Sequence, residues 1–181
     1  MRKSPLISIC LRNGTLAGVL AILLLIGMYY AGRHPLMIAP FLDFRILLFG
    51  IFVFFSLKEF RENHQNGELH FWQGMAGGFI MVMVTATTAS VLLWIFTALE
   101  SDFVPEYVTK MTEYLKTFPK EDIERIGKDA YQRNLETLPS TNGKQIAASY
   151  FIQSMVIGFF VTIILSVTLR KQPKEIINSK P

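Results

Sequence analysis

Three long stretches without a charged side chain constrain this chain more than any other feature of its sequence. They cover residues 13–32, 71–99 and 145–169. A helix rises ~1.5 Å per residue, so ~20 apolar residues cross the ~30 Å hydrocarbon core of a bilayer. A helix of a water-soluble protein would turn one polar face to solvent, and these stretches have no such face. The sequence therefore predicts an all-α integral membrane protein with a single membrane domain over residues 1–181.

We expect four spans that form a four-helix bundle, at about residues 13–32, 41–57, 71–98 and 146–169. The second span is the shortest, because only the 12 residues Ile46–Leu57 are uncharged there. Twelve residues cover ~18 Å, so a crossing must extend back to residue 41 and include Asp43 and Arg45. Pro40 would then suit the first helical turn. The alternative for this segment is a re-entrant or interfacial helix.

A polar insert at residues 100–144 separates the third and fourth spans and is too long for a tight connection. Its first half has apolar residues at helical spacing on one face, and a second helix is predicted to begin near Pro119. The run 139–143 ends that helix. We expect a small helical extramembrane hairpin. The apolar face of its first helix consists of Val104, Val108, Met111, Leu115 and Phe118.

The charge distribution predicts orientation and excludes a nucleic-acid partner. The net charge is +4 and hydrophobic residues make up 51% of the chain, but the basic residues flank apolar spans, where they set topology. The side that includes both termini has a basic excess, and the other side is slightly acidic. We expect a multi-pass protein of the bacterial inner membrane with both termini in the cytoplasm. The first apolar stretch is predicted to be an uncleaved anchor rather than a signal peptide.

Small residues recur on three predicted spans and suit close helix packing. Two glycine pairs have GxxxG spacing, and the last span has a small residue every four positions. They pack the bundle internally or form contacts with a second membrane protein or a second copy of the chain. The candidate packing residues are Gly14, Gly18, Gly74, Gly78, Ser154, Gly158, Thr162 and Ser166.

The polar hinge between the second and third spans is the second candidate site. It contains Asn-Gly, a strong turn signal, followed by residues suited to the membrane interface. It forms a hydrogen-bonded turn, or it docks a partner or a lipid head group. The candidate residues are Arg61, Asn66, Gly67, Trp72 and Gln73. Nearby His64 and His70, with Glu62 and Glu68, match no metal-ligand spacing, so no metal or cofactor is expected.

Asp43 and Arg45 are the candidate polar site within the membrane. An ionisable group at membrane depth is a functional hypothesis by default. Their i, i+2 spacing predicts that they lie on different helix faces and do not pair with each other. They are interfacial residues at the start of a span, an ion or proton site, or members of a salt bridge between helices.

The segment Phe60–Gly74, with Trp94-Ile95 and Asp102–Tyr107, resembles a family of bacterial four-span membrane proteins. This family is the domain of unknown function forty-one ninety-nine. The likeness extends over nearly the whole chain. It implies four helices and a long outward insert between the third and fourth, and it implies no activity and no catalytic or binding residue.

Two classes of function remain at this stage. The first is a non-catalytic accessory or scaffold subunit that packs through small-residue helix faces. The second is a small oligomeric transporter or channel, whose polar path would need Asp43, Arg45 and the hydroxyl-rich segment 85–90. No nucleophile, phosphate-binding or metal motif is present, so we do not expect an enzyme. The expected partners are the lipid bilayer and a second membrane protein or a second copy.

Overall fold

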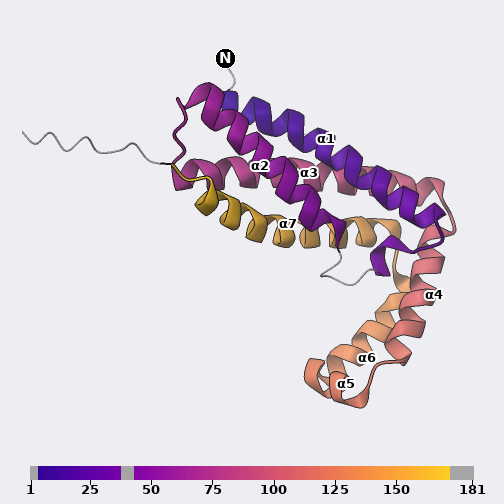
Figure 1. Ribbon diagram of the computed structural model, residues 1–181. Coiled ribbons are helices and arrows are strands. Elements are labelled where there is room, and N and C mark those ends of the chain that lie inside the picture. Colours follow the sequence, from indigo (N-terminus) through magenta and orange to yellow (C-terminus); the bar gives the residue numbers. More distant parts are fainter. Residues whose placement is uncertain (1–3, 38–42, 172–181) are drawn as a thin grey trace, which may run out of the picture.

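Four long helices lie side by side, and three shorter helices project from one end of them (Figure 1). The computed structural model describes residues 4–37 and 43–171. The four long helices are α1 (Pro5–Tyr30), α2 (Phe44–His64), α3 (Phe71–Leu99) and α7 (Gly143–Thr168). Between α3 and α7 come α4 (Phe103–Lys116), α5 (Lys120–Ile126) and α6 (Lys128–Thr137). Short 3-10 turns follow α1 (η1, Pro35–Met37) and α6 (η3, Leu138–Ser140).

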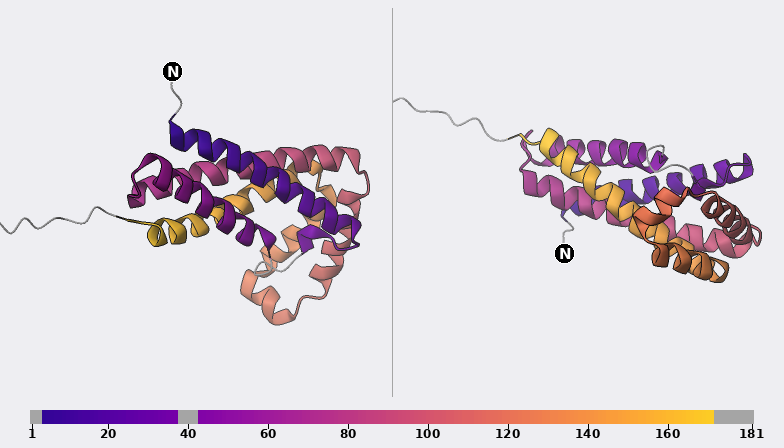
Figure 2. Two further views of the ribbon diagram at one scale, coloured as in Figure 1. Left: turned by 45° about the horizontal axis from the view of Figure 1, so that its top comes forward. Right: turned by 90° about the horizontal axis from the view of Figure 1, so that it is seen from below.

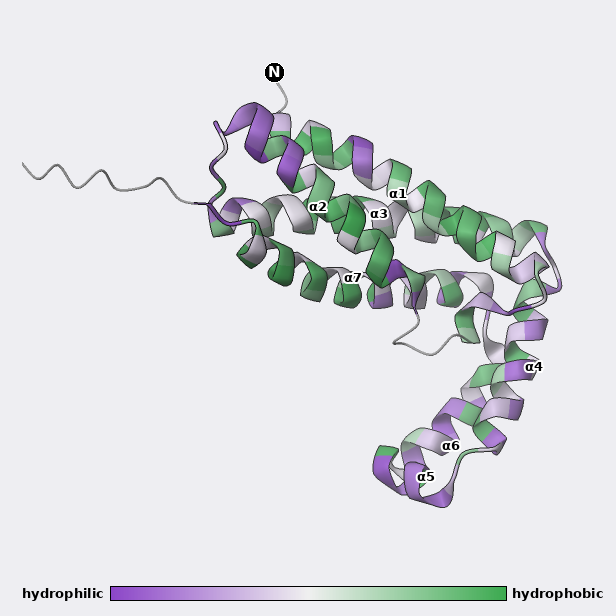
Figure 3. Ribbon diagram, viewed as in Figure 1, coloured by the Kyte–Doolittle hydropathy of each residue, from purple (hydrophilic) through white to green (hydrophobic). Residues whose placement is uncertain are grey.

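Within the described residues the protein is all-α and contains no strand, as predicted; one isolated bridge joins the backbones of Leu69 and Lys171. Three helices are long and apolar enough to cross a membrane: α1, α3 and α7. The fourth long helix, α2, packs in the same bundle, but its last turns are charged. Its apolar stretch is therefore shorter than those of α1, α3 and α7. Hydropathy colouring separates the green bundle from the mostly purple helices α5 and α6 (Figure 3).

On α3 and α7, mostly small residues lie inside the bundle and large apolar residues lie outside, the reverse of a water-soluble helical protein. Glycine, alanine and serine make up much of the buried face of α3, while Phe79, Met83 and Ile95 of the same helix are exposed. On α7, Phe160 and Ile164 are exposed, whereas Ser154 and Thr162 are buried. A broad apolar surface of this kind requires a hydrocarbon environment. This protein is therefore a membrane protein.

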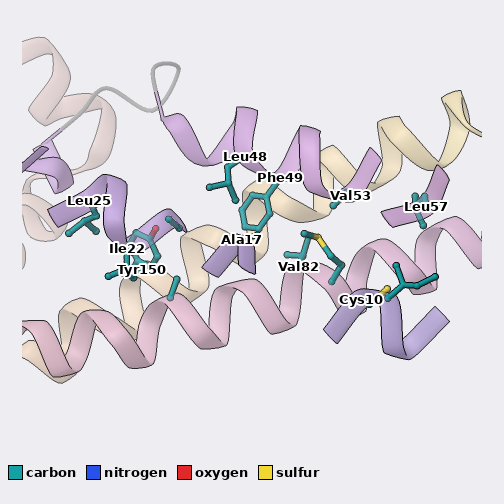
Figure 4. Packing of buried hydrophobic residues seen from close by; sticks show 14 of the residues in the cluster. Cys10, Ala17, Ile22, Leu25, Leu48, Phe49, Val53, Leu57, Val82 and Tyr150 are labelled. Atoms are coloured by element: carbon teal, nitrogen blue, oxygen red, sulfur yellow. The ribbon is translucent and has the colours of Figure 1, made fainter. Parts of the chain in front are cut away.

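The core contains side chains from all four long helices. Figure 4 shows residues of α2 meeting those of α1, with the ring of Phe49 beside Ala17, and Val82 of α3 and Tyr150 of α7 in the same core. Two apolar side chains of α2, Val53 and Leu57, have no exposed surface. Burial of α2 on this face fixes it against its neighbours although its apolar stretch is short.

Several helix boundaries differ from those expected from charge alone. The first helix begins at Pro5 rather than residue 13, because a proline fits the first turn and Arg12 pairs with Glu59 instead of interrupting the helix. Glu59, the partner of Arg12, likewise does not interrupt α2, which continues to His64, past the predicted end at residue 57. Charges mark the end of a hydrophobic stretch, not the end of a helix. The proposed role of Pro40 lies outside the described residues.

The insert differs from the predicted two-helix hairpin in one respect. Its second half is two short helices, α5 and α6, because Gly127 between them has a φ of +90°. An L-amino acid with a side chain rarely adopts this conformation, so the glycine allows the break.

The start of α7 is fixed by a capping box, in which Asn142 Oδ1 accepts from the Gln145 N–H and Gln145 Oε1 accepts from the Asn142 N–H.

The two ends of the bundle are different. The start of α1, the α2–α3 hinge and the end of α7 lie together at one end, and α4–α6 lie at the other (Figures 1 and 2). The segments that the charge pattern assigns to one side of the membrane are thus neighbours in space.

Candidate functional site

Arg45 of α2 is the centre of the densest polar contact network in the bundle. Its side chain is 9% exposed and that of its ion-pair partner, Asp43, is 13% exposed. Arg45 Nε donates to both carboxylate oxygens of Asp43 at 2.9 and 2.8 Å, and Nη2 donates to the same carboxylate. Asp43 Oδ1 also accepts from the Arg45 backbone N–H at 2.9 Å, which caps the first turn of α2.

The remaining donors of Arg45 reach across to α7. Nη1 donates to the Tyr150 carbonyl oxygen at 3.3 Å and to Ser154 Oγ at 3.1 Å. Nη2 donates to Gln153 Oε1 at 3.0 Å. The guanidinium also lies over the Tyr150 ring, 4.5 Å from its centroid. A guanidinium has five N–H donors, and all five are used here.

A saturated guanidinium cannot bind a further anion without losing a contact that it already makes. The network therefore acts as a clamp between the start of α2 and the middle of α7, which we call the Arg45 clamp (Asp43, Arg45, Tyr150, Gln153 and Ser154). Of the three alternatives for Asp43 and Arg45, the geometry corresponds to residues that cap the start of a span, because Asp43 is the N-cap of α2 and the ion pair is local to that turn. The contacts of Arg45 with α7 are hydrogen bonds to uncharged acceptors, not a salt bridge between helices.

The expectation that Asp43 and Arg45 do not pair was wrong. It treated both residues as helical, in which case positions i and i+2 would face apart. Asp43 is the N-cap and its backbone is extended, with a φ of −66° and a ψ of 112°. Its side chain therefore folds back over the first turn, where the long Arg45 side chain meets it.

The candidate small residues lie at two helix–helix contacts inside the bundle. Gly14 and Gly18 of α1 face α3, so that a Cβ at Gly18 would lie 2.7 Å from Thr88 Cβ and 2.9 Å from the Thr85 carbonyl oxygen. The second contact joins α3 to α7. There Gly74 faces Ser166, Gly78 faces Thr162, and Gly158 faces Val82. Ser154, the remaining member, belongs to the Arg45 clamp.

The hydroxyl-rich segment 85–90 does not line an open path. Thr85 is buried, and its hydroxyl donates to the Met81 carbonyl oxygen of its own helix at 2.9 Å. Thr88 packs against Gly18 of α1, and Thr87 is on the exposed side of α3. The Thr85 hydroxyl thus satisfies itself on its own helix backbone and is not available to a path.

The hinge residues form a hydrogen-bonded turn tied to the end of α7. Asn66 and Gly67 have positive φ values of 51° and 85°, and the Gly67 N–H donates to the Arg61 carbonyl oxygen at 2.9 Å. Arg61 Nη1 donates to the Leu169 carbonyl oxygen at 3.5 Å. Gln73 Oε1 accepts from the backbone N–H of His70, the N-cap of α3. The neighbouring Trp72 is 66% exposed.

Replacement of Gly67 by alanine is expected to destabilise the protein by about 1–2 kcal/mol, because the αL conformation is costly for a residue with a Cβ. Gly50→Ala is the matched control, since Gly50 is helical and a Cβ there would meet open space. The control should be neutral or slightly stabilising. Unfolding by denaturing detergent, followed by circular dichroism, measures both; equal effects would contradict the turn assignment.

A buried histidine at the other end of the bundle was not identified from the sequence. His34 is 5% exposed and its ring packs on Phe103 and Tyr107 of α4, with centroids 4.7 and 5.5 Å apart. Its Nε2 lies 3.3 Å from the Phe103 carbonyl oxygen, and Nδ1 has no hydrogen-bond partner among the described residues. We call this contact the His34 junction, because it joins the bundle to α4. Gly32, which has a φ of +80° after α1, and the adjoining Pro35 are sequence signals for an ordered turn there.

Burial lowers the pKa of His34 below its usual value of 6.5. The Phe103 carbonyl oxygen and Glu106 oppose this shift, and Lys110 adds to it. Lys110 also forms an ion pair with Glu106, which lowers the pKa of that carboxyl group. The structure therefore favours neutral His34, with Nε2–H donating to the carbonyl.

Docking of α4 is expected to weaken as the pH falls below about 6.5. The undocked state binds the proton more readily than the docked state, so acid favours undocking; above the ordinary pKa the stabilisation is complete. Hydrogen exchange of the α4 backbone, corrected for intrinsic rates, should rise between about pH 7.5 and about pH 5.5. His34→Gln should remove this dependence, and an unchanged dependence in that variant would contradict the assignment.

Comparison with protein families assigns the chain to one of them. Residues 12–171 match the model of a family described as a protein of unknown function, DUF4199. The chain belongs to this family. Neither the curated proteins nor the solved structures contain a match. The DUF4199 match covers α1 from residue 12 onward, the other three long helices and the insert, so the Arg45 clamp and the His34 junction both lie inside the family domain. In the described residues, no three His, Cys, Asp or Glu side chains gather as a metal site.

Proposed function

We propose that this DUF4199 protein is a non-catalytic accessory or scaffold subunit of the bacterial inner membrane, with both termini cytoplasmic. In this proposal the bundle, including α2 as a fourth crossing, is a rigid platform. The insert α4–α6 is the part that engages a partner protein on the outer side. The proposal rests mainly on one observation, the incomplete burial of the insert.

Helices α5 and α6 have no buried residue. Tyr114 and Ile126 of the insert are 52% and 49% exposed. They lie outside the bundle, so the hydrocarbon of the bilayer does not cover them. Both line a hollow of about 390 Å³ at the turn between α4 and α5. A small helical unit without a core of its own gains stability when a partner covers such apolar residues.

The Arg45 clamp favours a scaffold over the alternative of a transporter or channel. The polar residues that a path would need are occupied, since all five donors of Arg45 have acceptors on Asp43 and α7. A cavity of about 410 Å³ is lined by apolar residues and by four clamp residues, Asp43, Arg45, Tyr150 and Gln153. The Arg45 guanidinium at this cavity has no free donor, because its N–H groups already reach Asp43 and α7. An ion-coupled carrier would need an exchangeable polar site there.

Affinity purification from native membranes in mild detergent tests this function. A second protein should co-purify in a fixed ratio, identified by mass spectrometry. Ile126→Glu should lose that protein because it places a charge in the hollow. Gln132→Glu adds the same charge on an exposed position of α6 and should retain it. A chain that purifies without a stoichiometric partner in every mild detergent would contradict the proposal.

A further inference from the structure

A shallow apolar groove runs between α3 and α7 near the insert end of the bundle. Its volume is about 450 Å³ and its surface is almost entirely carbon. Its apolar lining consists of Val91, Trp94, Ala147, Ala148, Phe151 and Ile152. All of these residues belong to helices long and apolar enough to cross a membrane. The groove therefore opens toward the hydrocarbon of the bilayer.

Two adjacent alanines of α7, Ala147 and Ala148, line the groove together with the larger side chains of Trp94 and Phe151. The small side chains leave room for a ligand there. Ser90 also lines the groove, but its hydroxyl oxygen is itself buried, so the surface that the groove offers a ligand is apolar.

One end of the groove is cationic. Lys144 lines it and is exposed, with its ammonium over the Trp94 ring, 5.7 Å from the centroid. Lys144 is in the first turn of α7, where the helix dipole adds positive potential. A lysine above an aromatic ring at the end of an apolar span is suited to a phosphate at the membrane interface.

The length of the groove matches one lipid leaflet. From Lys144 to Ile152 the helix rises ~12 Å, against ~15 Å for half of the hydrocarbon core. We propose that this groove is a specific site for an anionic phospholipid. The phosphate binds Lys144, and one acyl chain lies along the two alanines. This inference goes beyond the scaffold function and depends only on α3 and α7 crossing the membrane.

A second copy of the chain fits the groove less well than a lipid. Two copies in one membrane share an orientation, so a twofold axis lies along the membrane normal and equal depths meet. Lys144 of one copy would then approach Lys144 of the other, and like charges in apolar surroundings oppose association. A single anionic lipid instead supplies both the negative charge and the hydrocarbon.

Native mass spectrometry of the delipidated full chain tests the site, with phosphatidylglycerol and phosphatidylcholine of the same acyl chains as probes. We expect one tightly bound phosphatidylglycerol and weaker phosphatidylcholine. Lys144→Gln should weaken phosphatidylglycerol binding about fivefold. Ala148→Phe should weaken both lipids, because it fills the groove. Lys116→Gln in the insert and Ile164→Phe on the exposed face of α7 are matched controls and should bind as the unaltered chain does.

Trp94→Ala provides a second groove variant in case Ala148→Phe lowers stability, and it should weaken phosphatidylglycerol as well. Equal affinity of the groove variants and their controls would overturn the proposal. So would a lipid-free dimer that Ala148→Phe converts to a monomer, since the groove would then be an interface between copies.

Discussion

Arg45→Ala is expected to lower the free energy of unfolding by about 3–5 kcal/mol. The substitution leaves the carboxylate of Asp43 buried without its partner. It also removes the donors to Gln153 Oε1, Ser154 Oγ and the Tyr150 carbonyl oxygen. The start of α2 should then separate from α7 before the rest of the bundle unfolds. Equilibrium unfolding in mixed detergent measures the loss.

The double variant D43N/R45M separates the ion pair from packing. Methionine keeps much of the arginine volume, and asparagine keeps an oxygen that caps α2. Because no charge is left unpaired, the double variant should be clearly more stable than Arg45→Ala. A loss of less than about 1 kcal/mol in Arg45→Ala would show that the clamp contributes little.

Gly18→Leu is expected to cost about 3 kcal/mol or more, because overpacking at a close helix contact forces the backbones apart. A Cβ at this position would meet the Thr85 carbonyl oxygen of α3 at 2.9 Å. A backbone atom cannot move away as a side chain can. Helix α1 must therefore shift along the whole α1–α3 contact.

Gly27→Leu is the matched control for this prediction. Gly27 is in the same helix, and a Cβ there would meet nothing within 4 Å. The control changes helix propensity and apolarity in the same way but leaves the contact intact, so it should be neutral or stabilising. Both variants are compared by the same unfolding titration. If Gly18→Leu were as stable as its control, the close α1–α3 contact would be wrong.

Three of the four expected spans and the helices of the insert were predictable because they follow from composition. Long runs without charge must lie in hydrocarbon, and the run 100–144 is too polar and too long to do so. The helix of Phe103–Lys116 followed from apolar spacing on one face, and all five residues of that predicted face are half-buried. These features depend on residues close together in the sequence.

The two sites depend on residues far apart in the sequence, and sequence reasoning gave them only in part. Asp43 and Arg45 were candidates from their depth, but the α7 groups that accept from Arg45 are more than a hundred residues away in the sequence. His34 was missed because a lone histidine after a span resembles any loop residue. Its burial becomes visible only when Phe103 and Tyr107 fold onto it. Gly127, between Ile126 and Lys128, was a signal for the break that we did not use.

Labelling of single cysteines with a membrane-impermeant maleimide in intact cells tests the central claim, a four-helix membrane bundle with its insert outside. Cys10 is replaced by alanine, and one cysteine is introduced at Ser4, Glu62 or Glu121, each of which is exposed. We predict labelling at position 121 only, with positions 4 and 62 reacting after the membrane is permeabilised. Labelling at position 62 but not at positions 4 and 121 would show that α2 does not cross, and would contradict the account.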